Sequence, residues 1–575
     1  MKKKPVLIST AIVLLAVGVY FFLDSDIASR SSPYQHAFSK HSSTKHSGRS
    51  SFYLDDDIDA RPHASLEAKD NKDRSLPVEE DTGKNTEKQI PDETLVTFDS
   101  SANYEQFLLE AQRNNMSILS KIPELNAIRL SSDDGSSLFN LIDAYDEALE
   151  VSPNFYVSLP QESIPIVGDE NREPVPFNNR LLDWMGYEEA EANWGSGVIV
   201  AVIDSGIENH PFFQGVSIQR IQISSEASST VTSASTTSIT ASNAAEEQTL
   251  NPVYHGTAVA SLIASNHETA PGIAPGVSLI DIPVLDSTGS GNTFSLAEAI
   301  VLATQAGAAI INLSLQSYGM NTVMEAAIKY ANDRGVTLVA ASGNDGFAEL
   351  AYPARHAAVV AVGAIDLERL HAGFSNGGET LDVTAPGVGL WVAWGSNEVY
   401  SFSGTSAATA VVSGVLSAVL SKDADLKGSS LQDLLSRHAD DAGQAGRDIV
   451  YGNGIINLAR LLQRNQRGIY DAALANHYLL QENNASTVTV QSIIQNQGTE
   501  PLWNLIHNVS VQNVPRMFNI SRLEVGQVAV NEVEVDQSRI AAQSITITSK
   551  VEVTQTDDSK PLNNELSAVI RQKDE

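Results

Sequence analysis

The sequence predicts an α/β fold in which a parallel sheet carries helices on both faces, preceded by a small α+β unit and followed by an all-β domain. The first observation is that continuous apolar segments alternate with helical patterns between residues 178 and 465, as at 197–203, 309–313 and 336–341. Strands of this kind are typical of a parallel sheet that is buried on both faces. We therefore expect one large α/β domain over 178–465.

The second observation concerns residues 91–160, where short apolar strands and amphipathic helices follow one another. The pattern predicts strands at 95–98, 117–119, 127–130 and 154–157, and helices at 104–114 and 137–149. The order β-α-β-β-α-β is the split βαβ, or ferredoxin-like, arrangement.

The third observation is a change of periodicity after residue 484. Apolar and polar residues alternate at 487–490, 528–530, 533–535 and 545–547, as they do in antiparallel strands that are buried on one face. Residues 484–575 are therefore expected to form an all-β domain, and no motif in them indicates a function.

The N-terminus carries a candidate membrane segment. Three lysines at 2–4 precede an uncharged run from Val6 to Leu23, which is long enough as a helix to cross most of a bilayer. We predict a signal anchor over 1–23; a cleaved signal peptide and a buried helix are the alternatives. Residues 24–90 are polar and lack apolar periodicity, so a disordered linker is expected there.

Composition excludes several classes of function. The formal net charge is −33, and such an excess of negative charge disfavours nucleic acid as a partner. The chain contains no cysteine, so disulfide frameworks, Cys-ligated zinc and thiol nucleophiles are excluded.

Four polar residues stand at the ends of predicted elements. Asp204 ends a buried strand, His255 opens a helix of small residues, Asn344 follows another buried strand, and Ser406 follows Gly404 at the start of an apolar helix. A serine hydroxyl needs a base to become a nucleophile, and an imidazole oriented by a buried carboxylate is such a base. Backbone N–H groups at a helix start, together with a side-chain amide, can stabilise an oxyanion.

Each of these residues alone has a simpler interpretation as a cap or a satisfied polar group. Together, in the order Asp, His, Asn, Ser, they resemble the subtilisin-like serine proteases, or subtilases. The resemblance is carried by Asp-Ser-Gly-Ile at 204–207, His-Gly-Thr at 255–257, Gly-Thr-Ser-Ala at 404–407 and Tyr-Gly-Asn-Gly at 451–454. It covers roughly residues 180–462 and implies a serine endopeptidase with a subtilisin-like parallel sheet.

The resemblance implies a role for each residue. Ser406 would be the nucleophile, His255 the general base and acid, Asp204 its orienting partner, and Asn344 with the Ser406 N–H the oxyanion hole. It also implies that substrate is bound as an added strand and that a pocket receives the side chain before the scissile bond. The expected substrate-binding residues are Gly289, Ser290, Gly291, Ser314, Leu315, Gln316, Ser342, Gly343 and Ala351. Gln316 departs from the family, in which Gly is usual.

No metal ligand is predicted and no cofactor is required for the implied catalysis. A structural Ca²⁺ is compatible with the resemblance, although the stretch Ser265–Gly272 is short where some family members bind calcium.

The α+β unit resembles the inhibitor-type propeptide of the same family. The expected partners are therefore protein or peptide substrates, the chain's own propeptide as inhibitor and folding aid, and a membrane through residues 1–23 before maturation. We expect an extracytoplasmic protein: an anchored precursor whose mature enzyme is periplasmic, on the cell surface or secreted, with the maturation cut between about Leu159 and Asn178.

The sequence disfavours two other functions. A lipase or esterase with an α/β-hydrolase fold would need Gly-x-Ser-x-Gly and the order Ser, Asp, His, neither of which is found around Ser406. An inactive relative acting as an adhesin or scaffold is disfavoured because all four implied catalytic residues are present.

Overall fold

A computed structural model describes ten stretches of the chain, and all structural statements below concern them. They are residues 52–55, 67–68, 89–131, 141–142, 144–145, 149–160, 174–187, 190–223, 252–480 and 486–572. The predicted anchor at 1–23, most of the predicted linker at 24–90 and most of the predicted helix at 137–149 lie outside them.

The α+β unit contains one antiparallel sheet. Its elements are β3 (Gln89–Phe98), α2 (Ser101–Arg113), β4 (Ile118–Ile122), β5 (Ala127–Ser131) and β6 (Leu149–Ser158). The sheet order is β6-β3-β5-β4, which places the last strand beside the first and puts β3 and β5 in the centre, as in a ferredoxin-like arrangement. One face is packed by the apolar side of α2, where Tyr104, Phe107, Leu108 and Ala111 are buried.

The α/β region is built on a seven-stranded sheet in which every pairing is parallel. In spatial order the strands are β14 (Val383–Pro386), β13 (Val359–Ile365), β12 (Thr337–Ala341), β11 (Ile310–Leu313), β7 (Ile199–Asp204), β9 (Ser278–Pro283) and β8 (Ser217–Arg220). Successive strand residues point to opposite faces. Val200 and Val202 of β7 therefore join one apolar cluster, whereas Ala201 and Ile203 join another.

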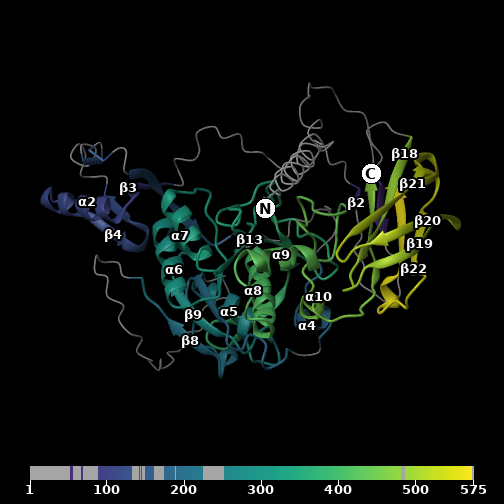
Figure 1. Cartoon of the computed structure of the whole chain (residues 1–575), viewed down its shortest axis with the longest axis horizontal. Helices are drawn as coiled ribbons and strands as arrows, with labels where there is room; N and C mark the ends of the chain where they lie inside the picture. Colours follow the sequence, from purple (N-terminus) through teal and green to yellow (C-terminus); the bar gives the residue numbers. More distant parts are fainter. Residues whose placement is uncertain are drawn as a thin grey trace, which may run out of the picture. The chain divides into compact units, whose positions relative to one another are not determined.

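Helices cover both faces of this sheet, as predicted (Figure 1). The helices α5 (His255–Ala264) and α8 (Thr405–Lys422) pack in the first cluster, and α6 (Thr293–Gln305) and α7 (Thr322–Asn332) in the second. Smaller elements complete the region: α4 (Leu181–Trp184), β10 (Ser290–Asn292), β15 (Leu390–Trp394), β16 (Glu398–Phe402), α9 (Ser429–His438) and α10 (Leu458–Gln463). Within the described stretches, α8 is the one helix long and apolar enough to cross a membrane, and it is a buried core helix.

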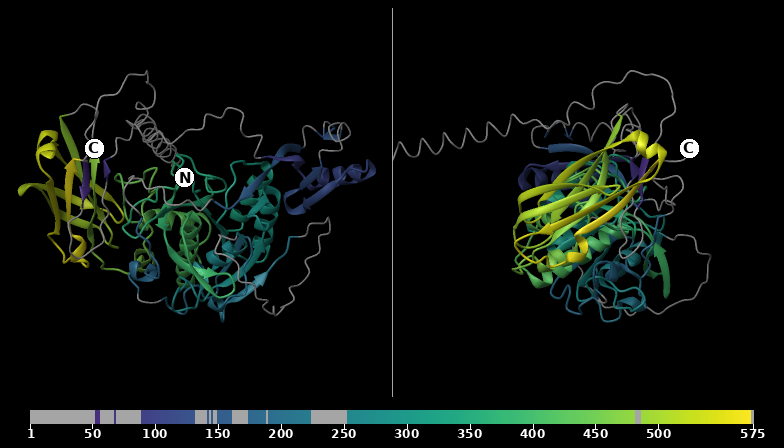
Figure 2. Two further views of the ribbon diagram at one scale, coloured as in Figure 1. Left: turned by 180° about the vertical axis from the view of Figure 1, so that it is seen from behind. Right: turned by 90° about the vertical axis from the view of Figure 1, so that its right-hand side faces the viewer.

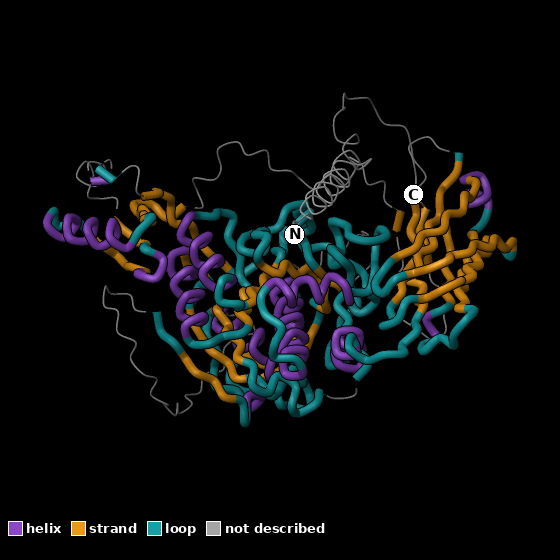
Figure 3. The backbone as a smooth tube through the Cα atoms, viewed as in Figure 1, coloured by secondary structure: helices purple, strands orange, loops and turns teal. Residues whose placement is uncertain are grey.

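The C-terminal region is almost entirely β-structure (Figure 3). One sheet holds β17 (Ala472–Leu480), β18 (Thr487–Asn496) and β21 (Val528–Asp536). The other holds β19 (Leu502–Val511), β20 (Val514–Leu523), β22 (Ile545–Val553) and β23 (Glu565–Gln572), and α11 (Gln537–Ala542) lies between β21 and β22. Residues of both sheets share one apolar cluster, so the region is a sandwich; its strands can be followed in Figure 2.

Two features of this region differ from the expectation. The first strand, β17, begins at Ala472, twelve residues before the expected boundary at 484. Two short strands of the expected linker, β1 (Phe52–Asp55) and β2 (Glu67–Ala68), extend the second sheet beyond β23. Backbone pairing with an open sheet edge thus gives order to stretches whose side chains show little periodicity.

Buried polar contacts join the sandwich to the α/β region. The Gln495 side chain on β18 donates to the Ala439 carbonyl (3.0 Å) and accepts from the Asp441 N–H (3.1 Å). Arg460, 3% exposed, is held within the α/β region by the Ala439 carbonyl (2.6 Å) and also donates to Gln495 Oε1 and the Asn496 carbonyl of β18, both at 3.5 Å. A buried polar group costs free energy when its partner is removed. Each region therefore contributes to the stability of the other.

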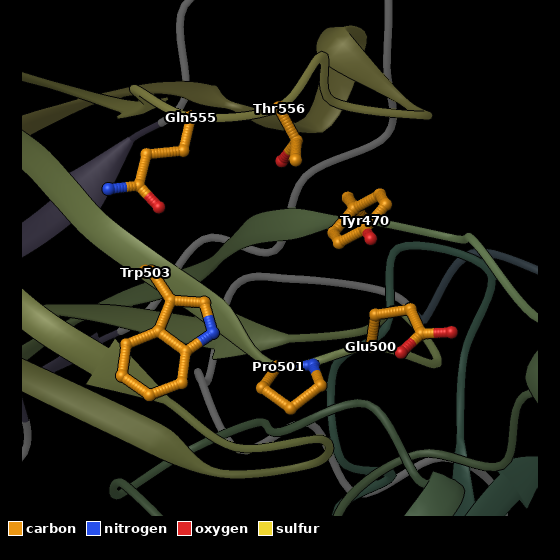
Figure 4. Close-up of a pocket in the computed structure, with 6 residues that line it drawn as sticks. All are labelled: Tyr470, Glu500, Pro501, Trp503, Gln555 and Thr556. Atoms are coloured by element: carbon orange, nitrogen blue, oxygen red, sulfur yellow. The ribbon is translucent and has the colours of Figure 1, made fainter.

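A shallow pocket occurs on the C-terminal region (Figure 4). It is lined by Tyr470, Glu500, Pro501, Trp503, Gln555 and Thr556, and none of these is a predicted site residue.

Candidate active site

The carboxylate and the imidazole predicted as a pair are in contact. Asp204 is the last residue of β7 and His255 the first of α5. His255 Nδ1 lies 2.9 Å from Asp204 Oδ1 and 3.0 Å from Oδ2. Asp204 has no exposed surface and His255 is 3% exposed. A buried carboxylate at this distance holds the proton on Nδ1 and so leaves Nε2 as the basic nitrogen.

The loop after Asp204 is fastened directly to the start of α5. Ser205 Oγ donates to the Val253 carbonyl and accepts from the Gly256 N–H, both at 3.1 Å. A Cβ on Gly256 would lie 2.5 Å from the Gly206 carbonyl oxygen, a distance that van der Waals contact forbids. Glycine at 256 therefore lets the two loops approach closely enough for Asp204 to reach His255.

A second buried carboxylate lies on the neighbouring strand. Arg220 donates to Asp281 Oδ2 and to the Ile207 carbonyl, each at 2.6 Å. Burial raises the pKa of Asp281, and Arg220 opposes that rise. This arginine connects β9 to the loop that follows Asp204, so it helps to hold the acidic member of the pair.

The predicted nucleophile stands at the beginning of a long buried helix. Ser406 is the second residue of α8 and is 2% exposed. Gly404 precedes the helix with φ 148°, in the region that favours glycine. Asn344 Oδ1 accepts from Thr405 N–H (2.9 Å) and from Thr405 Oγ1 (2.8 Å). These bonds fix the Asn344 amide beside the N-terminus of α8, where the helix dipole also favours negative charge.

One predicted substrate-binding residue, Ser314, forms two hydrogen bonds with the predicted nucleophile. Ser314 Oγ donates to the Ser406 carbonyl at 3.1 Å, and Ser406 Oγ donates to the Ser314 carbonyl at 3.3 Å. The segment that follows β11 is thus joined to the start of α8.

A segment of the chain itself lies between the two predicted substrate-binding segments, 289–291 and 314–316, and pairs with both. The end of β6 pairs with β10, with Ser290 opposite Ser158 and Gly291 opposite Val157. On its other edge Ser158 N–H donates to the Gln316 carbonyl (2.9 Å), and Gln316 N–H donates to the Ser158 carbonyl (2.8 Å). The next residue, Leu159, donates its N–H to the Gly289 carbonyl at 3.2 Å. This is β-augmentation on both sides of one strand.

The remaining predicted residues lie next to Asn344. Ser342 accepts at its carbonyl from the Ala351 N–H (3.0 Å), and Gly343 N–H donates to Thr405 Oγ1 (3.3 Å). The Leu315 side chain is fully buried in the core, so only its backbone can face a ligand. Within the described stretches, Gln316 Oε1 and Ser342 Oγ are buried without a hydrogen-bond partner.

Several residues near these positions have no role assigned from the sequence. Thr405, which fixes the Asn344 amide, lies inside the Gly-Thr-Ser motif but carried no assigned role. The pairing of Ser158 and Leu159 with the predicted substrate-binding segments was not predicted. The predicted strand ended at residue 157, and nothing in the sequence indicated its pairing partners. Tyr318, whose hydroxyl donates to the Asp345 carboxylate, was also missed; burial and this carboxylate raise its pKa.

A metal site is not apparent in the described stretches, where no group of three or more His, Asp or Glu residues is placed to hold an ion. No residue can therefore be assigned to the structural Ca²⁺ that the resemblance allows.

Comparison with known proteins decides the family. A family model described as "Subtilase family" matches residues 195–454. Subtilisin Savinase from Lederbergia lenta is 35% identical over 265 residues, covering 46% of this chain and 90% of that protein. The chain belongs to the subtilase family. Its α/β region is a subtilisin-like serine endopeptidase domain, and the predicted family and fold class are confirmed.

Two further relatives define how far the similarity extends. M-protease from Shouchella clausii is 36% identical over 265 residues, and the chain spans 63% of that protein's length. The crystal structure of fervidolysin from Fervidobacterium pennivorans is described as that of a keratinolytic enzyme related to subtilisin. The alignment covers 84% of this chain and 92% of the fervidolysin chain. At 17% identity and a TM-score of 0.53, it supports the fold of this subtilase and not its substrate.

Proposed function

We propose that this subtilase hydrolyses peptide bonds through an acyl-enzyme on Ser406. The observation that carries the proposal is the buried contact between His255 Nδ1 and the Asp204 carboxylate, on a domain that carries Ser406 as the second residue of α8. His255 takes the proton of Ser406 as its oxygen attacks the substrate carbonyl, and then gives it to the leaving nitrogen. Asp204 stabilises the imidazolium that forms between these steps.

The oxyanion is proposed to bind Asn344 and the Ser406 N–H. The amide of Asn344 is held by Thr405 through two hydrogen bonds, so it needs little reorganisation when charge develops. Substrate would lie between 289–291 and 314–316 as an added strand, with Ser342, Gly343 and Ala351 near the side chain before the scissile bond. Catalysis requires no metal in this scheme.

Residues 91–160 are proposed to be an inhibitory propeptide. Support comes from the end of β6, which occupies both edges of the proposed substrate cleft. We further propose that 1–23 anchors a precursor outside the cytoplasm, that 178–465 is the catalytic domain, and that the β-rich region after it remains attached. Cleavage after the propeptide would then separate the enzyme from its anchor.

Active-site labelling tests the proposed chemistry. An organophosphonate should react with the matured wild-type chain at Ser406 and leave the Ser406→Ala variant unlabelled. Absence of label on wild-type protein that is folded would contradict the nucleophile assignment.

Sequencing the N-terminus of the active species tests the proposed maturation. We expect a start within 160–178, and an active species starting upstream of Thr94 would contradict propeptide removal.

A further inference from the structure

The segment in the cleft has a defined antiparallel register with the substrate strand. Ser158 is opposite Gln316, with hydrogen bonds of 2.9 and 2.8 Å in the two directions. In an antiparallel ladder the next closely bonded pair lies two residues further along each strand. Continuing this register places Pro160, which is buried, opposite Ser314.

Ser314 is also the residue of that strand tied to the proposed nucleophile. Its hydroxyl donates to the Ser406 carbonyl (3.1 Å), and its carbonyl accepts from Ser406 Oγ (3.3 Å). The residue opposite Ser314 would therefore be the one nearest to Ser406 on this strand. In this chain that residue is a proline.

Proline cannot complete the ladder at this point because it has no backbone N–H. Any other residue at 160 could donate to the Ser314 carbonyl. Instead this carbonyl accepts the Ser406 hydroxyl, which must donate to His255 when it attacks. Without a donor at residue 160, Pro160 is bound less firmly to the Ser314 strand. The Ser406 hydroxyl also keeps donating its proton to the Ser314 carbonyl and not to His255.

We propose that the maturation cut of this chain is the bond after Pro160, and that proline at this position slows the cut by withholding the backbone donor for Ser314. The inference rests on the proposed function. In the cut, Ser406 Oγ bonds to the Pro160 carbonyl carbon, and the Oγ proton passes by way of His255 to the nitrogen of Gln161 as the C–N bond breaks. Water then hydrolyses the acyl-enzyme, which frees the Pro160 carboxylate and restores Ser406.

Peptide substrates separate the missing donor from the proline ring. The matured enzyme is assayed with acetyl-Val-Ser-Leu-Xaa-p-nitroanilide, where Xaa is proline, alanine or N-methylalanine; the last lacks the N–H but has no ring. One backbone hydrogen bond corresponds to up to about tenfold in rate. We expect kcat/KM for alanine to exceed that for proline by about tenfold, with N-methylalanine close to proline. Equal rates for proline and alanine, or an N-methylalanine peptide as fast as alanine, overturn the inference.

The full-length precursor tests the same point in place. Conversion is followed by gel and N-terminal sequencing for wild type, Pro160→Ala and a control, Tyr156→Ala, whose side chain is exposed on the same strand. Wild type should yield a start at Gln161, Pro160→Ala the same start with a half-life about tenfold shorter, and the control a half-life within about twofold of wild type. A different start, an unchanged half-life for Pro160→Ala, or conversion of a Ser406→Ala precursor overturns the inference.

Casein hydrolysis distinguishes the two levels of failure. If casein is hydrolysed but Pro160→Ala converts no faster, this inference fails and the proposed function stands. If folded, matured enzyme leaves casein intact, the proposed function fails and the inference fails with it.

Discussion

The contact between Asp204 and His255 allows a quantitative test. Replacing Asp204 by Asn keeps the size of the side chain and removes its charge. The imidazolium formed in the reaction would lose a carboxylate whose oxygens lie 2.9 and 3.0 Å from Nδ1. Two unit charges about 4 Å apart at an effective dielectric constant of about 20 interact by about 4 kcal/mol, which is roughly 10³ in rate. The amide also favours the wrong tautomer of His255, so a loss of roughly 10³–10⁴ in kcat is expected.

The assay compares kcat for a peptide p-nitroanilide near pH 7 in wild type, Asp204→Asn and Ser406→Ala. Because Asp204 is fully buried, a thermal melt of each variant must accompany the kinetics to show that the fold is retained. A folded Asp204→Asn enzyme that loses less than about tenfold in kcat would refute the idea that this carboxylate stabilises the imidazolium. A loss confined to KM would refute it equally, since the charge acts in the transition state.

Three further outcomes are expected. Asn344→Ala should lower kcat by roughly 10²–10³ with KM little changed, because an oxyanion donor acts in the transition state; a change confined to KM in a peptide assay would contradict this. Burial lowers the pKa of His507 to about 4 in the folded sandwich, against about 6.5 when unfolded. The unfolded chain thus binds more protons between these values, so the free energy of unfolding should fall by about 3 kcal/mol as the pH drops from 7 to 4. In urea titrations this fall should be smaller in His507→Gln, and an identical fall in both proteins would refute the assignment. Asn154 is fully buried and its amide is hydrogen-bonded to Glu93, Thr293 and the Phe294 N–H. Asn154→Ala should speed dissociation of the cleaved propeptide unit about thirtyfold, since about 2 kcal/mol is lost, whereas Gln112→Ala, at an exposed position of α2, should leave it unchanged.

The fold could be predicted where periodicity and burial coincide. The strands at β7, β11 and β12 are continuously apolar because helices cover both faces, and that pattern is visible in the sequence alone. The strand β17 was missed because Ala472–Leu480 is rich in alanine and leucine, which favour helix locally. Its structure comes from pairing with β18 along its whole length, and backbone pairing with a neighbouring strand leaves no periodic signal in the side chains of β17.

The site could be predicted where a motif stands at the end of an element. Asp204 and His255 were expected to meet, and they are in contact. The hydrogen bond from Thr405 Oγ1 to Asn344, by contrast, spans 61 residues and depends on how α8 lies against β12. The proposed role of Pro160 likewise depends on a contact between distant residues, because the pairing of Ser158 with Gln316 sets its position.

The contacts of the α+β unit imply that cutting the chain and activating it are separate events. Hydrolysis after Pro160 breaks one covalent bond, but it leaves the pairing of β6 with β10 and with Gln316. It also leaves Asn154 buried against the N-terminus of α6, where it accepts hydrogen bonds from the Thr293 hydroxyl (2.8 Å) and the Phe294 N–H (3.2 Å). Each of these bonds is worth about 1 kcal/mol and together they exceed thermal energy many times. A cleaved unit would therefore stay in the cleft until it dissociates or is degraded, and the lag between cleavage and activity measures how tightly it is held.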